Sequence, residues 1–161
     1  MPLGANLDRL LPEQIELLLA NARLLQRAVG PLQRQGLLRG RNLALICESA
    51  DDADAVVFLE AASDLGAHVS HIRPSLSDLR APAALQHTAR MLGRLYHGIE
   101  CQGMPADLVS QLGWEAGIPV YDGVASPRHP VARLAKLLGA GESFDKERQL
   151  ILQAVLMSTL V

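Results

Sequence analysis

The sequence has few aromatic residues and no long hydrophobic run. Phe, Trp and Tyr together make up 3% of its 161 residues, although hydrophobic residues as a whole make up 49%. A buried core must therefore be built mainly from Leu, Ala, Val and Ile. No apolar run approaches the roughly 20 residues of a membrane-spanning helix, and the first residues lack the basic and then apolar pattern of a signal peptide. We therefore expect a cytoplasmic protein with no membrane partner.

The sequence also lacks an excess of one charge and a metal-binding cysteine pattern. Its net charge at pH 7 is −2, and acidic and basic residues are interspersed, which argues against a nucleic-acid partner. Cys47 and Cys101 each end an apolar stretch, without the spacing of a zinc or redox motif. We expect reduced, buried thiols, no metal site and no cofactor.

Apolar stretches of strand length alternate along the chain with amphipathic stretches of helical length. Strands are expected at 42–47, 68–72, 98–102 and 119–121, helices at 8–29, 52–65, 83–96, 105–116, 131–138 and 144–160, and non-helical connections at 33–41 and 74–82. This alternation predicts a parallel sheet covered by helices on both faces. The predicted fold class is α/β: a single three-layer domain with a parallel four-stranded sheet flanked by helices, closed by a C-terminal helix. We expect Trp114 and Tyr121 in its core.

Ligands of parallel sheets bind beyond the carboxyl ends of the strands. Here those ends lead into residues 51–54, 75–82 and 126–130. The first segment opens a helix, whose free N–H groups and dipole favour an anion, but it contains Asp51, Asp52 and Asp54. A carboxylate 5 Å from an anion costs about 3 kcal/mol at an effective dielectric constant of 20. We therefore expect aspartates that cap the helix and bind no phosphate. Clustered carboxylates could instead bind Mg²⁺, although consecutive residues at a helix start do not converge on one point.

Five segments resemble the carbamoyl-phosphate domain of ornithine transcarbamoylases, members of the ornithine/aspartate transcarbamoylase family. They are GRNLALICE at 40–48, FLEAASDLGAHV at 58–69, HTARMLGRLYHGIECQG at 87–103, AGIPVYDG at 116–123, and His129-Pro130. The similarity runs without a gap over about 37–138. Residues 145–161 resemble the family's carboxyl-terminal helix, which packs on the first domain after returning from a second one. The resemblance implies a carbamoyl-phosphate-like domain at 1–139, a glycine-rich joint and helix at 140–161, and a missing ornithine domain between them.

The resemblance also identifies a vestigial carbamoyl-phosphate site. The family's phosphate-binding motif Ser-Thr-Arg-Thr-Arg aligns with Asp51, Asp52, Ala53, Asp54 and Ala55, so its hydroxyls and guanidiniums are replaced.

Two further family positions keep their residues. Arg90 matches a phosphate-contacting arginine, and His129 matches the histidine of the family's His-Pro-x-Gln motif, whose glutamine is Ala132 here. The lysine that a neighbouring subunit supplies falls near 80–82, where there is none. We expect no catalytic residues, an ion pair between Arg90 and Asp52 or Asp54, and His129 as a packing residue at a helix start. The other histidines are expected at the surface or at edges.

Three functional hypotheses follow. The resemblance implies a homotrimer, so the first is a non-catalytic trimeric assembly or regulatory protein whose partner is a full-length transcarbamoylase or another protein. The second is a binding module for a small cationic or metal-linked ligand at the old cleft. The third is a residual carbamoyltransferase that works with a separate second domain.

Overall fold

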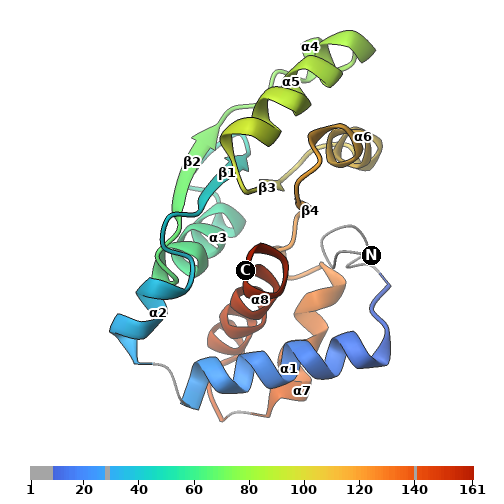
Figure 1. The fold of residues 1–161 in the computed structure, drawn as a ribbon. Coiled ribbons are helices and arrows are strands. Elements are labelled where there is room, and N and C mark those ends of the chain that lie inside the picture. The colour runs from blue at the N-terminus through green and yellow to red at the C-terminus, as the bar shows by residue number, and fades with distance from the viewer. Residues whose placement is uncertain (1–8, 28–29, 140) are drawn as a thin grey trace.

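The protein is an α/β domain built on a four-stranded parallel sheet (Figure 1). The computed structural model describes residues 9–27, 30–139 and 141–161. The strands are β1 (Asn42–Ile46), β2 (His68–Ile72), β3 (Gly98–Cys101) and β4 (Val120–Asp122), in the order β2-β1-β3-β4. All neighbouring strands are parallel, and Leu45 of β1 lies opposite both His71 and Glu100. The sheet predicted from the alternating pattern is confirmed.

Helices connect the strands and extend beyond the sheet. They are α1 (Pro12–Arg27), α2 (Pro31–Leu37), α3 (Ala53–Asp64), α4 (Leu76–Leu79), α5 (Pro82–Leu95), α6 (Ala106–Ala116), the 3₁₀ helix η2 (Pro130–Arg133), α7 (Leu134–Leu138) and α8 (Phe144–Leu160). Two were not expected: α2 overlaps the connection at 33–41, and the four-residue α4 lies in the loop at 74–82. The outermost residues of the helix predicted at 8–29, and residue 140 of the predicted joint, lie outside the described residues.

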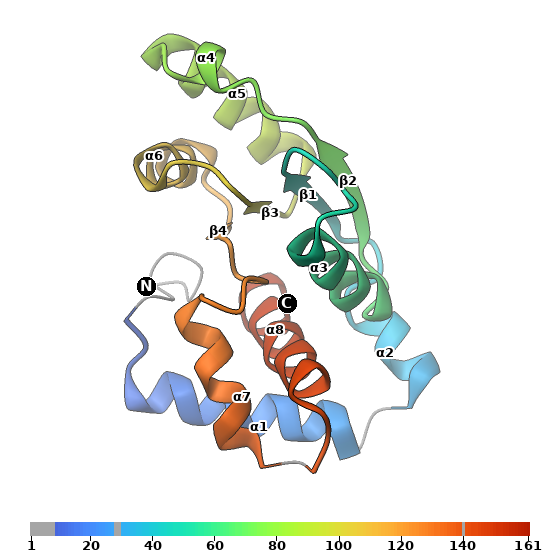
Figure 2. The same cartoon turned by 180° about the vertical axis from the view of Figure 1, so that it is seen from behind.

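The sheet separates two hydrophobic cores. Leu43 and Leu45 of β1 point into the first core, with α3 and α8, whereas Ala44 and Ile46 point into the second, with α5 and α6. This follows from the alternation of side chains along a strand. Figures 1 and 2 show α3 and α8 on one side of the strands and α5 and α6 on the other, which gives the predicted three layers.

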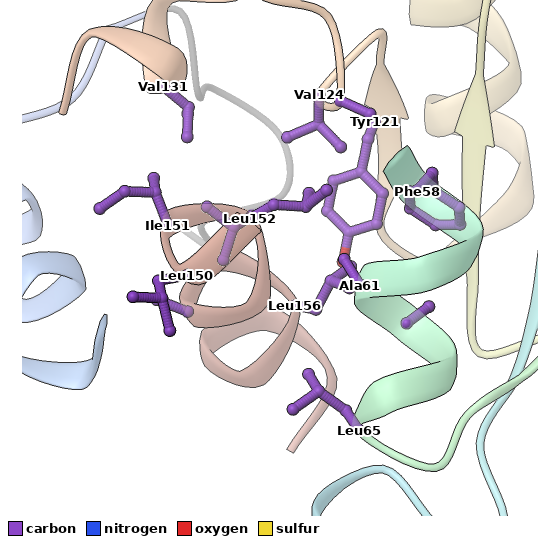
Figure 3. Close-up of a cluster of buried hydrophobic side chains, with 14 of the residues drawn as sticks. Phe58, Ala61, Leu65, Tyr121, Val124, Val131, Leu150, Ile151, Leu152 and Leu156 are labelled. Atoms are coloured by element: carbon purple, nitrogen blue, oxygen red, sulfur yellow. The ribbon is translucent and has the colours of Figure 1, made fainter. Parts of the chain in front are cut away.

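The last helix, α8, packs against α1, α3 and α7. Its apolar residues meet those of α3 and β4 in the first core, where Leu156 lies near Phe58 and Tyr121 (Figure 3). Gln153 is fully buried, and its Nε2 donates to Ala61 O at 3.2 Å and to Asp64 Oδ2 at 2.8 Å. The helix is thus fixed to α3 by polar contacts as well as by packing.

The aromatic residues behave differently from one another. Tyr121 is 1% exposed and its hydroxyl hydrogen-bonds with that of Thr159 in α8, as expected of a core residue. Trp114 is 88% exposed, so its predicted place in the core is wrong. The core-facing side of α6 carries Leu108 and Leu112, and at 3.6 residues per turn Trp114 lies on the opposite side of the helix.

The two cysteines are free and buried, as predicted. Cys47 belongs to the first core and Cys101 to the second, so the sheet lies between them. Burial raises the pKa of both thiols, which keeps them protonated at neutral pH. No helix in the described ranges has both the length and the apolar composition needed to cross a membrane.

The close contact between α5 and α6 gives a test of the fold. A Cβ atom on Gly93 would lie 2.1 Å from Ala116 O, whereas one on Gly36, in the exposed helix α2, would have no neighbour within 4 Å. We expect Gly93→Ala to lower the free energy of unfolding by about 1–3 kcal/mol, the usual cost of overpacking. Gly36→Ala should leave it unchanged or raise it slightly. Urea unfolding of both variants measures the difference, and equal stabilities would contradict the described contact.

Candidate functional site

A pocket of about 340 Å³ lies beyond the carboxyl ends of β1, β3 and β4. The chain moves from β1 to β2 on one side and then returns to β3 on the other, and this reversal leaves a crevice at the strand ends. The pocket is lined by Asp54, Gln102, Gly103, Asp122, Gly123, Ser126, Arg128, His129 and Pro130. Two of the three segments expected at this edge therefore contribute to it, but none of the described residues 75–82 does.

The aspartates at the start of α3 lie mostly outside the pocket. Asp51 and Asp52 are exposed, and only Asp54 lines the cavity. The predicted capping is wrong, because no side-chain hydrogen bond from the described residues caps the start of α3. Asp51 instead donates its backbone N–H to Ser49 Oγ at 3.2 Å. Nor do the described residues contain a group of three His, Cys, Asp or Glu side chains able to hold a metal ion.

Ala53 and Ala55 occupy opposite environments. Ala53 is exposed, whereas Ala55 is fully buried in the first core. Of the five positions aligned with the phosphate-binding motif, only Asp54 therefore reaches the pocket. An arginine at 55 would need to leave the core before it could contact a ligand.

Arg90 lies away from this pocket. Its Nε is 3.8 Å from Glu115 Oε2 of α6, so the predicted ion pair with Asp52 or Asp54 is wrong. Ala89 and Leu92 face the second core, which places Arg90 on the outer side of α5. There it lines a separate hollow of about 460 Å³ together with Ala83, Gln86, His87, Met91, Arg94 and Leu95.

His129 is buried where the loop after β4 enters η2. It is 7% exposed, and its Nδ1 accepts the backbone N–H of Val131 at 3.1 Å. His129 therefore lies buried at a helix start, as predicted, and its ring caps that helix, which was not predicted. Because Nδ1 is an acceptor, the neutral ring carries its proton on Nε2.

Glu100 and Gln102 were not identified from the sequence. Glu100 is fully buried, and its Oε1 and Oε2 accept the backbone N–H groups of Val124 and Ala125, each at 3.1 Å. Gln102 Nε2 donates to Glu100 Oε2 at 3.3 Å and to Asp54 O at 3.1 Å. Gln102 thus joins the first turn of α3 to β3. The signal in the sequence is a lone glutamate between Ile99 and Cys101.

The loop that forms one wall of the pocket is also held by α8. Arg148 Nη2 donates to Ala125 O at 2.8 Å. The guanidinium is kept in place by Asp145, 3.6 Å away, and by the ring of Phe144, 5.9 Å from its centre. The loop is thus fixed by Glu100 from the sheet and by Arg148 from the last helix.

Comparison with known proteins agrees with this architecture. Residues 5–142 match the family model described as the carbamoyl-phosphate-binding domain of aspartate/ornithine carbamoyltransferase. The chain belongs to the aspartate/ornithine carbamoyltransferase family. It is similar to ornithine carbamoyltransferase of Cutibacterium acnes, with 39% identity over 134 residues, which are 83% of this chain and 40% of that one. Catabolic ornithine carbamoyltransferase of Haemophilus influenzae is 38% identical over 133 residues, again 83% of this chain and 40% of that one.

Solved structures of the family have the same fold. Ornithine carbamoyltransferase of Pyrococcus furiosus superposes with a TM-score of 0.66 and 26% identity over 86% of this chain and 45% of that one. The enzyme of Gloeobacter violaceus gives a TM-score of 0.61 and 29% identity over 82% and 41%. The chain thus covers less than half the length of its carbamoyltransferase relatives.

The cap at His129 gives a test of the pocket wall in this carbamoyltransferase-family domain. His129→Ala removes the acceptor for Val131 N–H, and we expect the free energy of unfolding to fall by about 1 kcal/mol. His129→Asn provides another capping oxygen and should lose less. Equal losses in urea unfolding would show that the ring acts by packing alone.

Proposed function

We propose that this chain is a non-catalytic derivative of an ornithine carbamoyltransferase that serves as a trimeric assembly or regulatory protein in the cytoplasm. The observation that carries the proposal is the charge of the pocket, where Asp54 and Asp122 face the space at the strand ends. A carboxylate 5 Å from a phosphate opposes it by about 3 kcal/mol at an effective dielectric constant of 20. Arg128 is the one arginine or lysine among the lining residues. Both Arg128 and Asp122 are exposed, so solvent screens both charges, whereas Asp54 is half-buried. The lining thus holds two carboxylates and one guanidinium.

We further propose that the residues aligned with the phosphate-binding motif form a vestigial carbamoyl-phosphate site. Ala53 and Ala55 carry neither hydroxyl nor charge, and Arg90 is engaged with Glu115 on the outer side of α5. Of the residues assigned to this site, Asp54 and His129 lie at the pocket.

The arrangement of the last helix supports the loss of a second domain. The family resemblance places an ornithine domain between 138 and 144, where this chain passes directly from α7 to α8. We propose a division into a carbamoyl-phosphate-like domain at 1–139 and a short joint and helix at 140–161. A chain that has lost the ornithine domain would lack the groups that recognise the second substrate.

The outer face of α5 and α6 supports self-association. Met91 is 45% exposed, Leu95 59% and Trp114 88%, and exposed apolar side chains of this size are typical of interaction surfaces. Burial of this face between copies fits the homotrimer that the family resemblance implies. A full-length transcarbamoylase with a matching surface would fit the same face.

A binding module for a small cationic ligand is a second candidate. The carboxylates of Asp54 and Asp122 at a pocket of about 340 Å³ favour it, since they attract a cation as strongly as they oppose an anion. A residual carbamoyltransferase would require an anion site, which the same carboxylates oppose.

The charge argument is tested by restoring the aligned motif. We design the variant Asp51→Ser, Asp52→Thr, Ala53→Arg, Asp54→Thr and retain Ala55, because that position is buried. Calorimetric titration with inorganic phosphate should show no binding to the natural chain and measurable binding to this variant. A control with Asn at 51, 52 and 54 separates the removal of carboxylates from the added guanidinium. Phosphate binding by the natural chain as strong as by the restored variant would contradict the proposal.

The assembly is tested by light scattering of the chain alone and mixed with full-length transcarbamoylase from the same organism. We expect a homotrimer, and mixed species would identify the enzyme as the partner. The double variant Met91→Glu, Leu95→Glu should weaken assembly, whereas Leu24→Glu, at a leucine of α1 that is 57% exposed, should not. A stable monomer would reject the assembly proposal and favour the cationic-ligand module.

A further inference from the structure

Glu100 is buried at a point where three parts of the pocket wall meet. Its side chain leaves β3 on the face opposite Ile99 and Cys101, which belong to the second core, and it is 0% exposed. Its carboxyl oxygens contact the loop after β4, through Val124 and Ala125, and the side chain of Gln102. Since Gln102 also contacts Asp54 O, one carboxyl group connects β3, the loop and α3.

All of these contacts bring donors to the carboxyl group. The two loop contacts are backbone N–H groups, and the amide of Gln102 is oriented by Asp54 O, a carbonyl that can only accept. The Nε2 group then has one hydrogen for Asp54 O and one for Glu100. This arrangement fits an ionised carboxylate, which accepts at both oxygens.

Burial acts in the opposite direction. Desolvation raises the pKa of Glu100 to about 8, even though the hydrogen bonds from the loop and from Gln102 lower it. Both ionisation states are therefore accessible between pH 6 and 10. A protonated carboxyl group has one more hydrogen and is a weaker acceptor than a carboxylate, so the donor contacts at the oxygen that carries this hydrogen weaken.

We propose that Glu100 is a proton-operated latch, whose ionised form holds the loop and Gln102 in place and whose protonated form releases one of them and changes the shape of the pocket. The released group would be either the loop, which continues into Ser126, Arg128 and His129, or Gln102; all four residues line the pocket. The latch acts on the pocket whichever ligand or partner uses it. It therefore stands apart from the assembly proposal, and the two can fail separately.

We assign this titration to Glu100, because the titratable groups that interact with it keep their protons at neutral pH. The titratable groups that interact with it are Cys47 after β1, Cys101 on its own strand and Tyr121 in β4. Burial raises the pKa of all three, so they stay protonated at neutral pH. Across the loop, Arg148 of α8 contacts Ala125 O, and across Gln102 lies Asp54 of α3. In the described part of the chain no basic side chain lies within ion-pair distance of Glu100.

The raised pKa also fixes the sign of a stability change. The folded chain binds a proton at Glu100 up to about pH 8, whereas the unfolded chain releases it near pH 4.5. This contribution to the free energy of unfolding is fully present below about pH 4.5 and is lost as the pH rises to about 8. Glu100→Gln should remove this part of the pH dependence.

The latch is tested by nuclear magnetic resonance of the full chain between pH 6 and 10. We expect the backbone amide signals of Val124 and Ala125 and the side-chain amide signals of Gln102 to shift together with one midpoint near pH 8. In Glu100→Gln these shifts should disappear. Glu48→Gln, at an exposed glutamate after β1 that pairs with Arg73, should leave them unchanged.

If Glu100→Gln fails to fold, measurements on the natural chain alone still test the proposal. The carboxyl carbon of Glu100, followed by its own chemical shift, should titrate with a midpoint near pH 8. A midpoint near 4.5, or no joint shift of the loop amides and Gln102, would overturn the proposal. Joint shifts that persist in Glu100→Gln would overturn it as well.

Discussion

The packing of α8 against α3 is the interaction on which most of the structure depends. Ala154, Val155 and Leu156 are fully buried against the first core, and burial of each large apolar side chain contributes roughly 1.5–3 kcal/mol. Between the two helices, Gln153 adds a bond to Asp64, which also pairs with Arg34 of α2 at 3.3 Å. The last helix thereby fixes α3 and β4, and through Asp64 it also fixes α2, which leads into β1.

The same helix connects the core to the pocket. Arg148 holds the loop after β4 from one side, and Glu100 holds it from the other. Both residues act on backbone groups of the loop, so few side chains set the shape of the wall. The carboxylates of Asp54 and Asp122 belong to the lining of the pocket, apart from these framework contacts. The family assignment rests on the framework, and the proposed loss of catalysis rests on the lining.

The strands and their order of appearance could be predicted because apolar periodicity is local. The short helices α2 and α4 could not, since seven and four residues are too few for a period to be recognised. The exposure of Trp114 could not be predicted, because hydrophobicity alone does not show which side of a helix faces the core. In α6 the buried residues Leu108 and Leu112 define that side. Arg90 was paired with the wrong carboxylate because alignment with a family motif does not show which helix a side chain faces.

The site was predictable only in outline. Its position at the strand ends, and the presence of Asp54 and His129 there, follow from topology and local pattern. Glu100 and Gln102 were missed because their partners lie across the sheet from them, at Val124 and Ala125 and at Asp54. Contacts of this kind depend on how the strands pair, and the sequence of one segment alone does not show that pairing.

We expect α8 and the sheet to form one cooperative unit. Native-state hydrogen exchange measures this most directly, through the opening free energies of amides in α8 at 150–156 and in β1. We expect the same opening free energy for both, equal to that of global unfolding. Exchange in α8 through an opening of much lower free energy, with β1 still protected, would contradict it.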